Sequence, residues 1–388
     1  MKCKLSDICA FRKGKVDVSK LTLKTYISTE NMLPNKGGIT GARSLPAIPL
    51  TQEYKKGDVL VSNIRPYFKK IWRAKYDGGC SNDVLVFQGN SNIDRDFLYY
   101  VLANDDFFAY SMATSKGTKM PRGDKTSIMQ YEVPIFDIDT QRKIASVLRS
   151  LDEKIELNSA INNNLLQQTR VIFKHWFTDN PNLDTMKQVP LADLCLVVTK
   201  GTTPTTLGKP FVSKGINFIK AESILNNHAI DKEKFAFIDS ETNDLLKRSI
   251  ISSGDIVFTI AGTLGRFALI DDSVLPANTN QAVAIIRANQ SKVTPEYLYS
   301  FFLGNWHNDY YTKRIQQAVQ ANLSLGTIKS LPIPILSDKA MLEYLGIIKP
   351  IIAMTKANEL EITRLRAIRD ALLPQLMSGT LDVSDLDL

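Results

Sequence analysis

Two stretches of the chain, residues 140–177 and 337–377, repeat apolar positions every seven residues, the period of paired helices. In each stretch the pattern predicts a short helix, at about 140–149 and about 338–349, followed by a long one. Pro350 is expected in the first turn of the second long helix, where its missing N–H costs nothing. The predicted helix seam consists of Ile144, Leu148, Leu151, Ile155, Asn158, Leu165, Ile172, Ile348, Ile351, Asn358, Ile362, Leu365 and Leu372.

Asn158 and Asn358 occupy the same position of the seven-residue pattern, 200 residues apart. A lone Asn in a helix seam lowers stability but fixes the register and the partner. We therefore expect the two long helices to pair with each other, antiparallel, about a pseudo-twofold axis. The alternative is that each helix packs only on its own globular domain.

Outside these stretches the chain has short β-like runs broken by Gly, Pro and Asn, for example 58–64, 84–87, 255–260 and 282–286. The two halves also repeat each other in order. The matching pairs are 5–9 with 191–195, 56–61 with 253–258, 96–100 with 296–300, and 133–135 with 333–335. The predicted fold class is α+β, with two pseudo-repeated mixed α/β domains separated by two long antiparallel coiled-coil helices.

This repeat predicts five segments along the chain. They are a first domain over 1–137, a first helix region over 138–178, a second domain over 179–336, a second helix region over 337–378, and an acidic tail over 379–388. A helix over 152–176 would be about 37 Å long at ~1.5 Å per residue. Because B-DNA repeats every ~34–36 Å, such a spacer would set two reading domains about one helical turn apart.

Charge, cysteine and histidine content and the absence of catalytic motifs limit the classes of function that this chain can have. Among 388 residues, Lys and Arg number 48 against 40 Asp and Glu, a formal charge of +8, which favours a polyanionic partner. Four cysteines without a CxxC pair and three scattered histidines give no metal-site signal. The sequence has no P-loop, dinucleotide fingerprint or nucleophile elbow, so we expect no catalytic site. With no signal peptide or membrane span, a cytoplasmic protein is expected.

Basic and amide-rich loops are the candidate DNA contacts, since Lys and Arg neutralise phosphates and Arg, Asn and Gln can pair with base edges. In the first copy they are Lys55, Arg65, Tyr67, Lys69, Lys70, Lys116, Lys119, Arg122 and Lys125. In the second copy they are Lys200, Thr202, Thr203, Arg266, Asn278, Asn280, Gln281, Arg314, Gln316, Gln317, Gln320 and Asn322. For the aromatic residues Tyr67, Phe68 and Trp72, a place in the core is favoured over a stacking role.

Two variable domains, each followed by a long helix, resemble the specificity subunit of type I restriction–modification systems. The resemblance is carried by the helix opening at 140–158, Thr-Gln-Arg-Lys-Ile-Ala-Ser-Val-Leu-Arg-Ser-Leu-Asp-Glu-Lys-Ile-Glu-Leu-Asn, and by Leu-Leu-Pro-Gln-Leu-Met-Ser-Gly at 372–379. It implies that each domain reads one half of a bipartite DNA site and that the helices set the spacing and dock two modification subunits.

The same resemblance implies which chemistry belongs to partners. Modification subunits would use S-adenosylmethionine to methylate adenine N6, and a restriction subunit would use ATP and Mg²⁺ to translocate and cut DNA. This chain would hold no cofactor, and its partners would be double-stranded DNA and those subunits, with no membrane. Two alternatives stay open: the recognition subunit of a related type II system, and a coiled-coil interaction scaffold that does not bind DNA.

Overall fold

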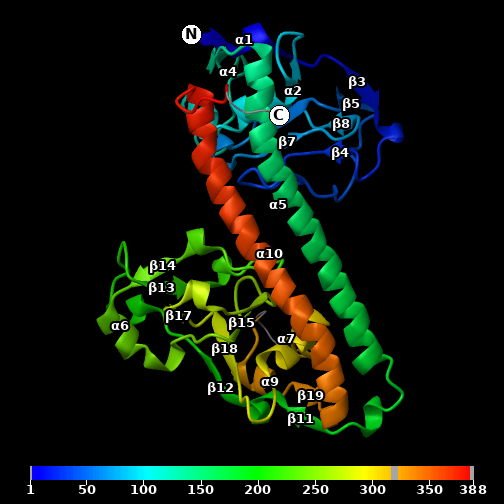
Figure 1. The fold of residues 1–388 in the computed structure, drawn as a ribbon, viewed down its shortest axis with the longest axis vertical. Coiled ribbons are helices and arrows are strands. Elements are labelled where there is room, and N and C mark those ends of the chain that lie inside the picture. Colours follow the sequence, from blue (N-terminus) through cyan, green and yellow to red (C-terminus); the bar gives the residue numbers. More distant parts are fainter. Residues whose placement is uncertain (1, 316–321, 385–388) are drawn as a thin grey trace. The chain divides into compact units, whose positions relative to one another are not determined.

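The computed structural model describes residues 2–315 and 322–384 (Figure 1). The chain forms two compact units. The first unit contains Met1–Leu157 and Ile362–Leu388, and the second contains Asn158–Glu361. Each unit therefore combines one globular domain with part of both long helices.

The first unit is built on two four-stranded sheets. One has the order β2 (Cys9–Phe11), β9 (Val84–Gly89), β6 (Val59–Ser62), β7 (Ile71–Arg73), and the other β3 (Lys15–Asp17), β5 (Leu50–Tyr54), β8 (Gly78–Cys80), β4 (Tyr26–Ile27). β1 (Lys2–Lys4) pairs with β10 (Glu132–Pro134). The short helices are α1 (Leu5–Ile8), α2 (Arg95–Ala103), α3 (Asp105–Ala113) and α4 (Lys125–Ile128).

The second unit repeats this plan. Its four-stranded sheet has the order β12 (Cys195–Lys200), β18 (Val283–Ala288), β15 (Ile256–Thr259), β16 (Phe267–Leu269), while a smaller sheet holds β14 (Ala236–Ile238), β13 (Ile216–Ile219), β17 (Ala277–Thr279). β11 (Gln188–Pro190) pairs with β19 (Pro332–Pro334), as β1 does with β10. The helices are α6 (Ser240–Leu245), α7 (Pro295–Leu303), α8 (Trp306–Ile315) and α9 (Leu325–Lys329). The predicted duplication is confirmed.

A Gly-Asp turn opens the equivalent central strands β6 and β15. Gly57 and Gly254 have φ of +93° and +83°, values that favour glycine. The following aspartates are buried and bound in a two-pronged ion pair. Arg12 holds Asp58 at 2.5 and 2.9 Å, and Arg287 holds Asp255 at 2.8 Å through both prongs. Arg12 follows β2 whereas Arg287 lies on β18, so the two copies build the same clamp from different strands.

Each helical region forms one continuous helix, α5 (Ile138–Phe173) and α10 (Asp338–Ser378). The prediction of a short helix followed by a long one is therefore wrong, and Pro350 lies inside α10. Tyr344, Ile348 and Ile352 are buried in one core on both sides of this proline, which keeps the helix continuous. Pro350 and Gly346 lie on the exposed face, where water can bond the Gly346 carbonyl that proline leaves without an N–H.

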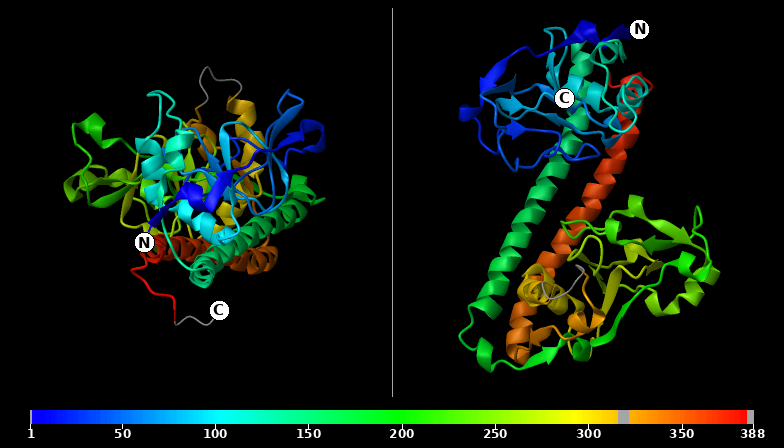
Figure 2. Two further views of the ribbon diagram at one scale, coloured as in Figure 1. Left: turned by 90° about the horizontal axis from the view of Figure 1, so that it is seen from above. Right: turned by 180° about the vertical axis from the view of Figure 1, so that it is seen from behind.

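The ends of the long helices complete the domain cores. Phe173 ends α5, and Phe177 lies in the helical turn that follows it, Lys174–Thr178; both are buried in the second unit, against Phe301 and Tyr344 respectively. Leu373 and Met377 at the end of α10 belong to the core of the first unit, together with Ile144 and Leu148 of α5. Figure 2 shows the red end of α10 beside the first domain, drawn in blue and cyan. Phe173 and Phe177 precede Leu373 and Met377 by 200 residues, so they hold equivalent positions in the two copies. In both copies, the end of the long helix packs in the core of the other domain.

Candidate nucleic-acid interface

A strained loop joins β6 to β7 in the first unit. Arg65 and Lys69 both have φ of +50°, and the 3-10 turn Pro66–Phe68 lies between them. A second loop contains Asn35 and Lys36, with φ of +54° and +59°. The N–H of Asn35 donates to the Phe68 carbonyl at 2.8 Å, and that of Lys36 to the Lys69 carbonyl at 2.9 Å. We call Asn35–Lys36 and Arg65–Lys69 together the loop pair.

Two aromatic side chains of the loop pair face solvent. Tyr67 is 48% exposed and Phe68 37%, and their ring centroids lie 4.6 Å apart. The expectation that these rings belong to the core is therefore wrong for Tyr67 and Phe68, although it holds for Trp72, which is 7% exposed. β6 ends at Ser62 and β7 begins at Ile71. The turn between them therefore carries Tyr67 and Phe68 beyond the sheet.

Several lysine side chains of the first domain form ion pairs or hydrogen bonds with other residues of the protein. Lys36 and Lys69 both bind Asp105, at 2.9 and 2.8 Å. Burial raises the pKa of Asp105, but the hydrogen bonds and charges of these two lysines outweigh it and lower that pKa overall. Lys70 donates to the Thr29 carbonyl at 2.6 Å, and its burial lowers its own pKa. Lys55 lies before β6, at the opposite end of that strand from Arg65–Lys69, and contacts Glu53 and Asp77 at 3.6 and 3.4 Å.

The basic loop before α4 lies against the loop pair. The N–H of Arg65 donates to the Pro121 carbonyl at 2.8 Å, and Ile64 forms a bridge with Arg122. Lys116 binds Asp124 at 2.5 Å, which together with hydrogen bonds from Ser127 lowers the pKa of that carboxyl to about 2. The side chains of Lys119 and Lys125 are exposed.

In the second unit the polar loop after β12 joins the loop after β17. The hydroxyl and N–H of Thr203 both donate to the Gln281 side-chain oxygen, and the N–H of Gly201 donates to the Asn280 carbonyl. Arg248 adds weak bonds to the Lys200 carbonyl and the Thr202 hydroxyl, at 3.5 and 3.4 Å. The structure thus gathers predicted residues from two distant segments of the sequence.

Two predicted contacts in this unit, Asn278 and Arg266, form hydrogen bonds within the domain. Asn278 is fully buried, accepts from Ser249 and donates to Asn243, which leaves no face of its amide for DNA. Arg266 is half-buried and donates to the Ile224 carbonyl at 3.1 Å. Asn322 is exposed. The side chain of Arg314, and Gln316, Gln317 and Gln320, lie outside the described residues.

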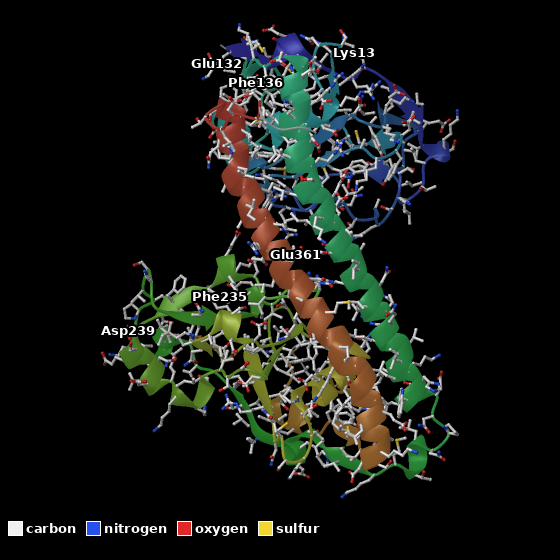
Figure 3. All side chains as sticks on the ribbon, viewed as in Figure 1. Lys13, Glu132, Phe136, Phe235, Asp239 and Glu361 are labelled. Carbon is white, nitrogen blue, oxygen red and sulfur yellow. The ribbon has the colours of Figure 1, made fainter. Side chains whose placement is uncertain are left out.

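Side chains of the predicted seam are buried or half-buried at every position. In the second unit Asn158 donates to Glu361 at 2.7 Å, and Asn358 donates to Asn162 at 2.8 Å. Glu361 is labelled on α10 in Figure 3. In the first unit Arg369 of α10 donates to Asp152 of α5 at 2.8 Å. Asn162 comes after Asn158 on α5, whereas its partner Asn358 comes before Glu361 on α10. The two helices of the second unit therefore run antiparallel.

Other apolar side chains of the two helices face outward. On α5, Leu157 is 55% exposed and Val171 69%; on α10, Leu342 is 74% exposed and Leu360 62%. Leu157 belongs to the first unit and the other three side chains belong to the second.

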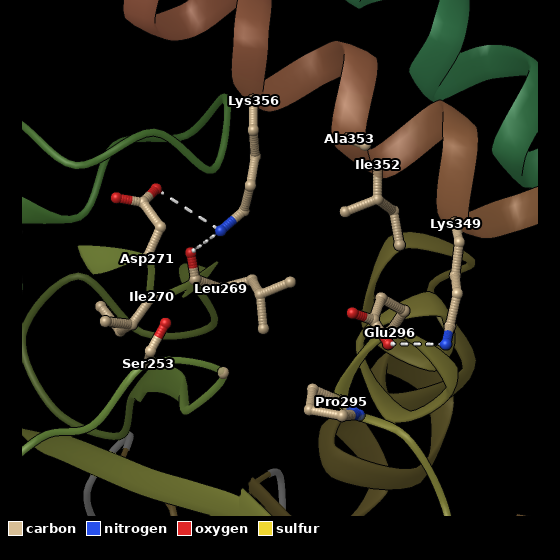
Figure 4. Close-up of a pocket in the computed structure, with 11 residues that line it drawn as sticks. Ser253, Leu269, Ile270, Asp271, Pro295, Glu296, Lys349, Ile352, Ala353 and Lys356 are labelled. Atoms are coloured by element: carbon tan, nitrogen blue, oxygen red, sulfur yellow. Dashed lines mark hydrogen bonds and ion pairs between the residues drawn. The ribbon is translucent and has the colours of Figure 1, made fainter. Parts of the chain in front are cut away.

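A pocket of about 330 Å³ lies between α10 and the second domain (Figure 4). Lys356 reaches across it to the Leu269 carbonyl at 2.9 Å and to Asp271 at 3.5 Å, while Lys349 approaches Glu296 at 3.9 Å. Both lysines therefore bind the helix to its domain. Arg149 and Asp96 repeat the Lys349–Glu296 contact in the first unit at 2.9 Å.

Sequence reasoning missed three residues of these loops: Asn35, Lys36 and Arg248. The run Pro34-Asn35-Lys36-Gly37-Gly38 carries a turn signal, since Asn and Gly tolerate left-handed backbone. No sequence signal distinguishes Arg248 from other surface arginines. Among the residues that the structure describes, no helix combines the length and apolarity needed to cross a membrane.

Comparison with known proteins completes the picture. The family model described as type I restriction modification DNA specificity domain matches residues 1–167 and 184–364. The specificity subunit of the type I restriction enzyme HindI from Haemophilus influenzae is 25% identical over 464 aligned residues, which span 97% of this chain and 98% of the relative. The MjaIX specificity subunit from Methanocaldococcus jannaschii is 23% identical, over 86% and 79% of the two chains.

A solved structure shares the fold. The crystal structure of a type I restriction–modification system S subunit from M. genitalium superposes with a TM-score of 0.60 at 15% identity. The match covers 97% of this chain and 96% of that one. The architecture of two repeated domains with two long helices is therefore shared along the whole chain.

Proposed function

The chain belongs to the family of type I restriction–modification DNA specificity domains, and we propose that its two domains, 1–137 and 179–336, each read one half of a bipartite, asymmetric DNA site. The observation that carries the proposal is the duplication itself. Two copies share a scaffold of strands and helices but differ in their loops. A shared scaffold with different loops suits two readers of unlike sequences, because loops carry binding residues on a rigid frame.

The chemistry of the loops supports DNA as the ligand. The first domain offers exposed cations at Lys116, Lys119, Arg122 and Lys125, suited to phosphates. The second offers amides and hydroxyls at Thr202, Thr203, Asn280 and Gln281, which can bond base edges or phosphates. Different loop chemistry fits an asymmetric target.

We assign α5 and α10 the docking of modification subunits, two in number. Leu157 in the first unit, and Val171, Leu342 and Leu360 in the second, are exposed apolar side chains that such partners could cover. S-adenosylmethionine, ATP and Mg²⁺ belong on the partner subunits in this proposal, and this chain contributes recognition without a catalytic site of its own.

Methylation mapping tests the function. The chain is co-expressed with its cognate modification subunit in a host that lacks adenine methylation, and methylated adenines are located by single-molecule sequencing. We expect one split sequence, methylated in both halves. Methylation of a continuous, unsplit sequence, or none above the modification subunit alone, would contradict the proposal.

Gel-shift titration across salt distinguishes the scaffold alternative. A DNA reader loses affinity steeply as salt rises, because bound phosphates release counterions. A scaffold that serves only protein assembly would shift no duplex at any salt concentration. A related type II system would be revealed by a partner that both methylates and cleaves.

A further inference from the structure

Within the first domain, the loop pair combines three features that a base-reading element needs: it is rigid, it projects from the sheet, and one arginine on it is uncommitted. This inference rests on the proposed function and assigns a role to a single residue in it.

The rigidity comes from strained backbone held by mutual hydrogen bonds. Among the described residues, six other than glycine have positive φ, and four of these form the loop pair: Asn35, Lys36, Arg65 and Lys69. Such conformations cost free energy and persist only where the surroundings enforce them, typically at functional sites. The two backbone bonds between the loops, and the grip of Lys36 and Lys69 on Asp105, enforce them here.

Arg65 differs from the neighbouring cations because its guanidinium has no described protein partner. Within residues 2–315 and 322–384, the guanidinium of Arg65 has no described hydrogen bond or ion pair, and its Nε is buried without a partner. Lys36, Lys69 and Lys70 beside it are all bonded to protein. The side chain as a whole is half-buried, so it would break no described protein contact on bonding to a ligand.

The neighbours of Arg65 have side chains of the kinds that contact DNA in the major groove. Tyr67 and Phe68 present exposed apolar rings two and three residues further on, which suits contact with thymine methyl groups and sugars. The basic loop carrying Lys119 and Arg122 lies against Arg65 through the Pro121 bond and can hold the adjoining phosphates. The planar fork of arginine matches O6 and N7 of guanine, the most common specific contact of this side chain.

We propose that Arg65 is the specificity-determining residue of the first domain and that it reads a guanine in the half-site of that domain, positioned by the strained loop pair. The lysines of the pair hold the loop in place, and the two rings flank the base contact.

The test uses the complex with its modification subunit, acting on a plasmid library in which the bipartite site is randomised one position at a time. Arg65→Lys keeps the charge and the side-chain stem but loses the fork. We expect it to relax selection at one G·C pair of one half-site by roughly 5- to 150-fold, the discrimination of a bidentate pair. Arg65→Ala should relax the same position. Arg43→Ala, an exposed arginine of the same domain outside the loop pair, is the control and should relax none.

Selection in the other half-site shows that each variant is folded and assembled. Unchanged selection by both Arg65 variants, relaxation at an A·T pair, or equal loss on all sequences would overturn the role of Arg65 while leaving the proposed function intact. If the wild-type complex itself selected no split sequence, the proposed function would fail and this inference with it.

Discussion

Asn358 of α10 donates a hydrogen bond to the side-chain oxygen of Asn162 on α5, at 2.8 Å, inside the helix pair of the second unit. Asn162 in turn donates to the Thr355 carbonyl of α10 at 3.1 Å. The two amides therefore fix which turn of one helix faces which turn of the other, the role that polar residues have in helix seams.

Asn162→Ala removes both bonds and leaves Asn358 with an unsatisfied, half-buried amide. We expect the free energy of unfolding to fall by about 1–2 kcal/mol, the usual cost of such a loss, measured by urea denaturation. Asn163→Ala is the matched control, since Asn163 is the exposed neighbour on the same helix. It should be neutral or stabilising by about 0.5 kcal/mol through helix propensity. Equal effects of the two changes would refute the role given to Asn162.

The pair Arg369–Asp152 joins α10 to α5 in the first unit. Its side chains are 12% and 21% exposed, Tyr100 also donates to Asp152, and the two nearby carboxylates, Asp152 and Asp370, raise the pKa of Arg369 despite its burial. Arg369→Met strands a partly buried carboxylate and should destabilise the protein by about 2–4 kcal/mol. Lys75→Ala breaks the Lys75–Glu156 pair, whose side chains are 55% and 58% exposed. That change should lower the free energy of unfolding by less than about 1 kcal/mol. A larger loss would show that the exposure of an ion pair does not decide how much it contributes to stability.

The repeat was predictable because its signals are local. The Gly-Asp turns at 57–58 and 254–255 require particular residues, and the predicted strands at 84–87 and 282–286 correspond to β9 and β18. The seven-residue pattern likewise located both long helices. The pattern did not reveal that Pro350 would lie inside α10, since burial on both sides of a proline is a tertiary effect.

The site was less predictable, because exposure depends on the whole fold. Tyr67 and Trp72 are both aromatic and five residues apart, yet one projects from a turn and the other is buried on β7. Asn278 and Gln281 lie in one amide cluster, but only the former points into the domain. The strain at Arg65 has no local signal at all, since arginine does not favour left-handed backbone.

Glu359 of α10 gives the second unit a pH dependence. Burial raises its pKa to about 7, Lys356 lowers it and Asp271 raises it. The ordinary pKa of a glutamate is 4.5, so the folded state holds an extra proton between that value and about 7. The stability contributed by Glu359 therefore falls as pH rises through this range. Glu359→Gln should therefore become the more stable form by about 1–3 kcal/mol at pH 8, but not at pH 4.

The measurement compares denaturation of both forms across that range. Burial lowers the pKa of His228 and His307 to about 4, which favours stability at higher pH, the opposite sense, and is common to both forms. The difference between variant and wild type therefore isolates Glu359. A difference that stays constant from pH 4 to 8 would show that Glu359 ionises normally.

The exposed Lys119, in the basic loop before α4, and Lys125, the first residue of α4, should strengthen binding to every DNA sequence equally. Lys119→Ala with Lys125→Ala should weaken duplex binding and reduce the slope of log affinity against log salt by about two, one for each phosphate that the variant no longer neutralises. Lys2→Ala with Lys4→Ala removes the same charge from β1 of the same unit and should leave the slope unchanged. Equal slopes for the two double variants would contradict a DNA contact at this loop.

The central claim, that two copies of one scaffold read two halves of a site independently, is tested most directly by exchanging one copy. Residues 1–137, with 373–383 because Leu373, Met377 and Val383 complete that core, are replaced by those of a relative with another target, and the methylated sequences are mapped. The account predicts a new sequence in one half of the site and the original sequence in the other. A change in both halves would contradict it.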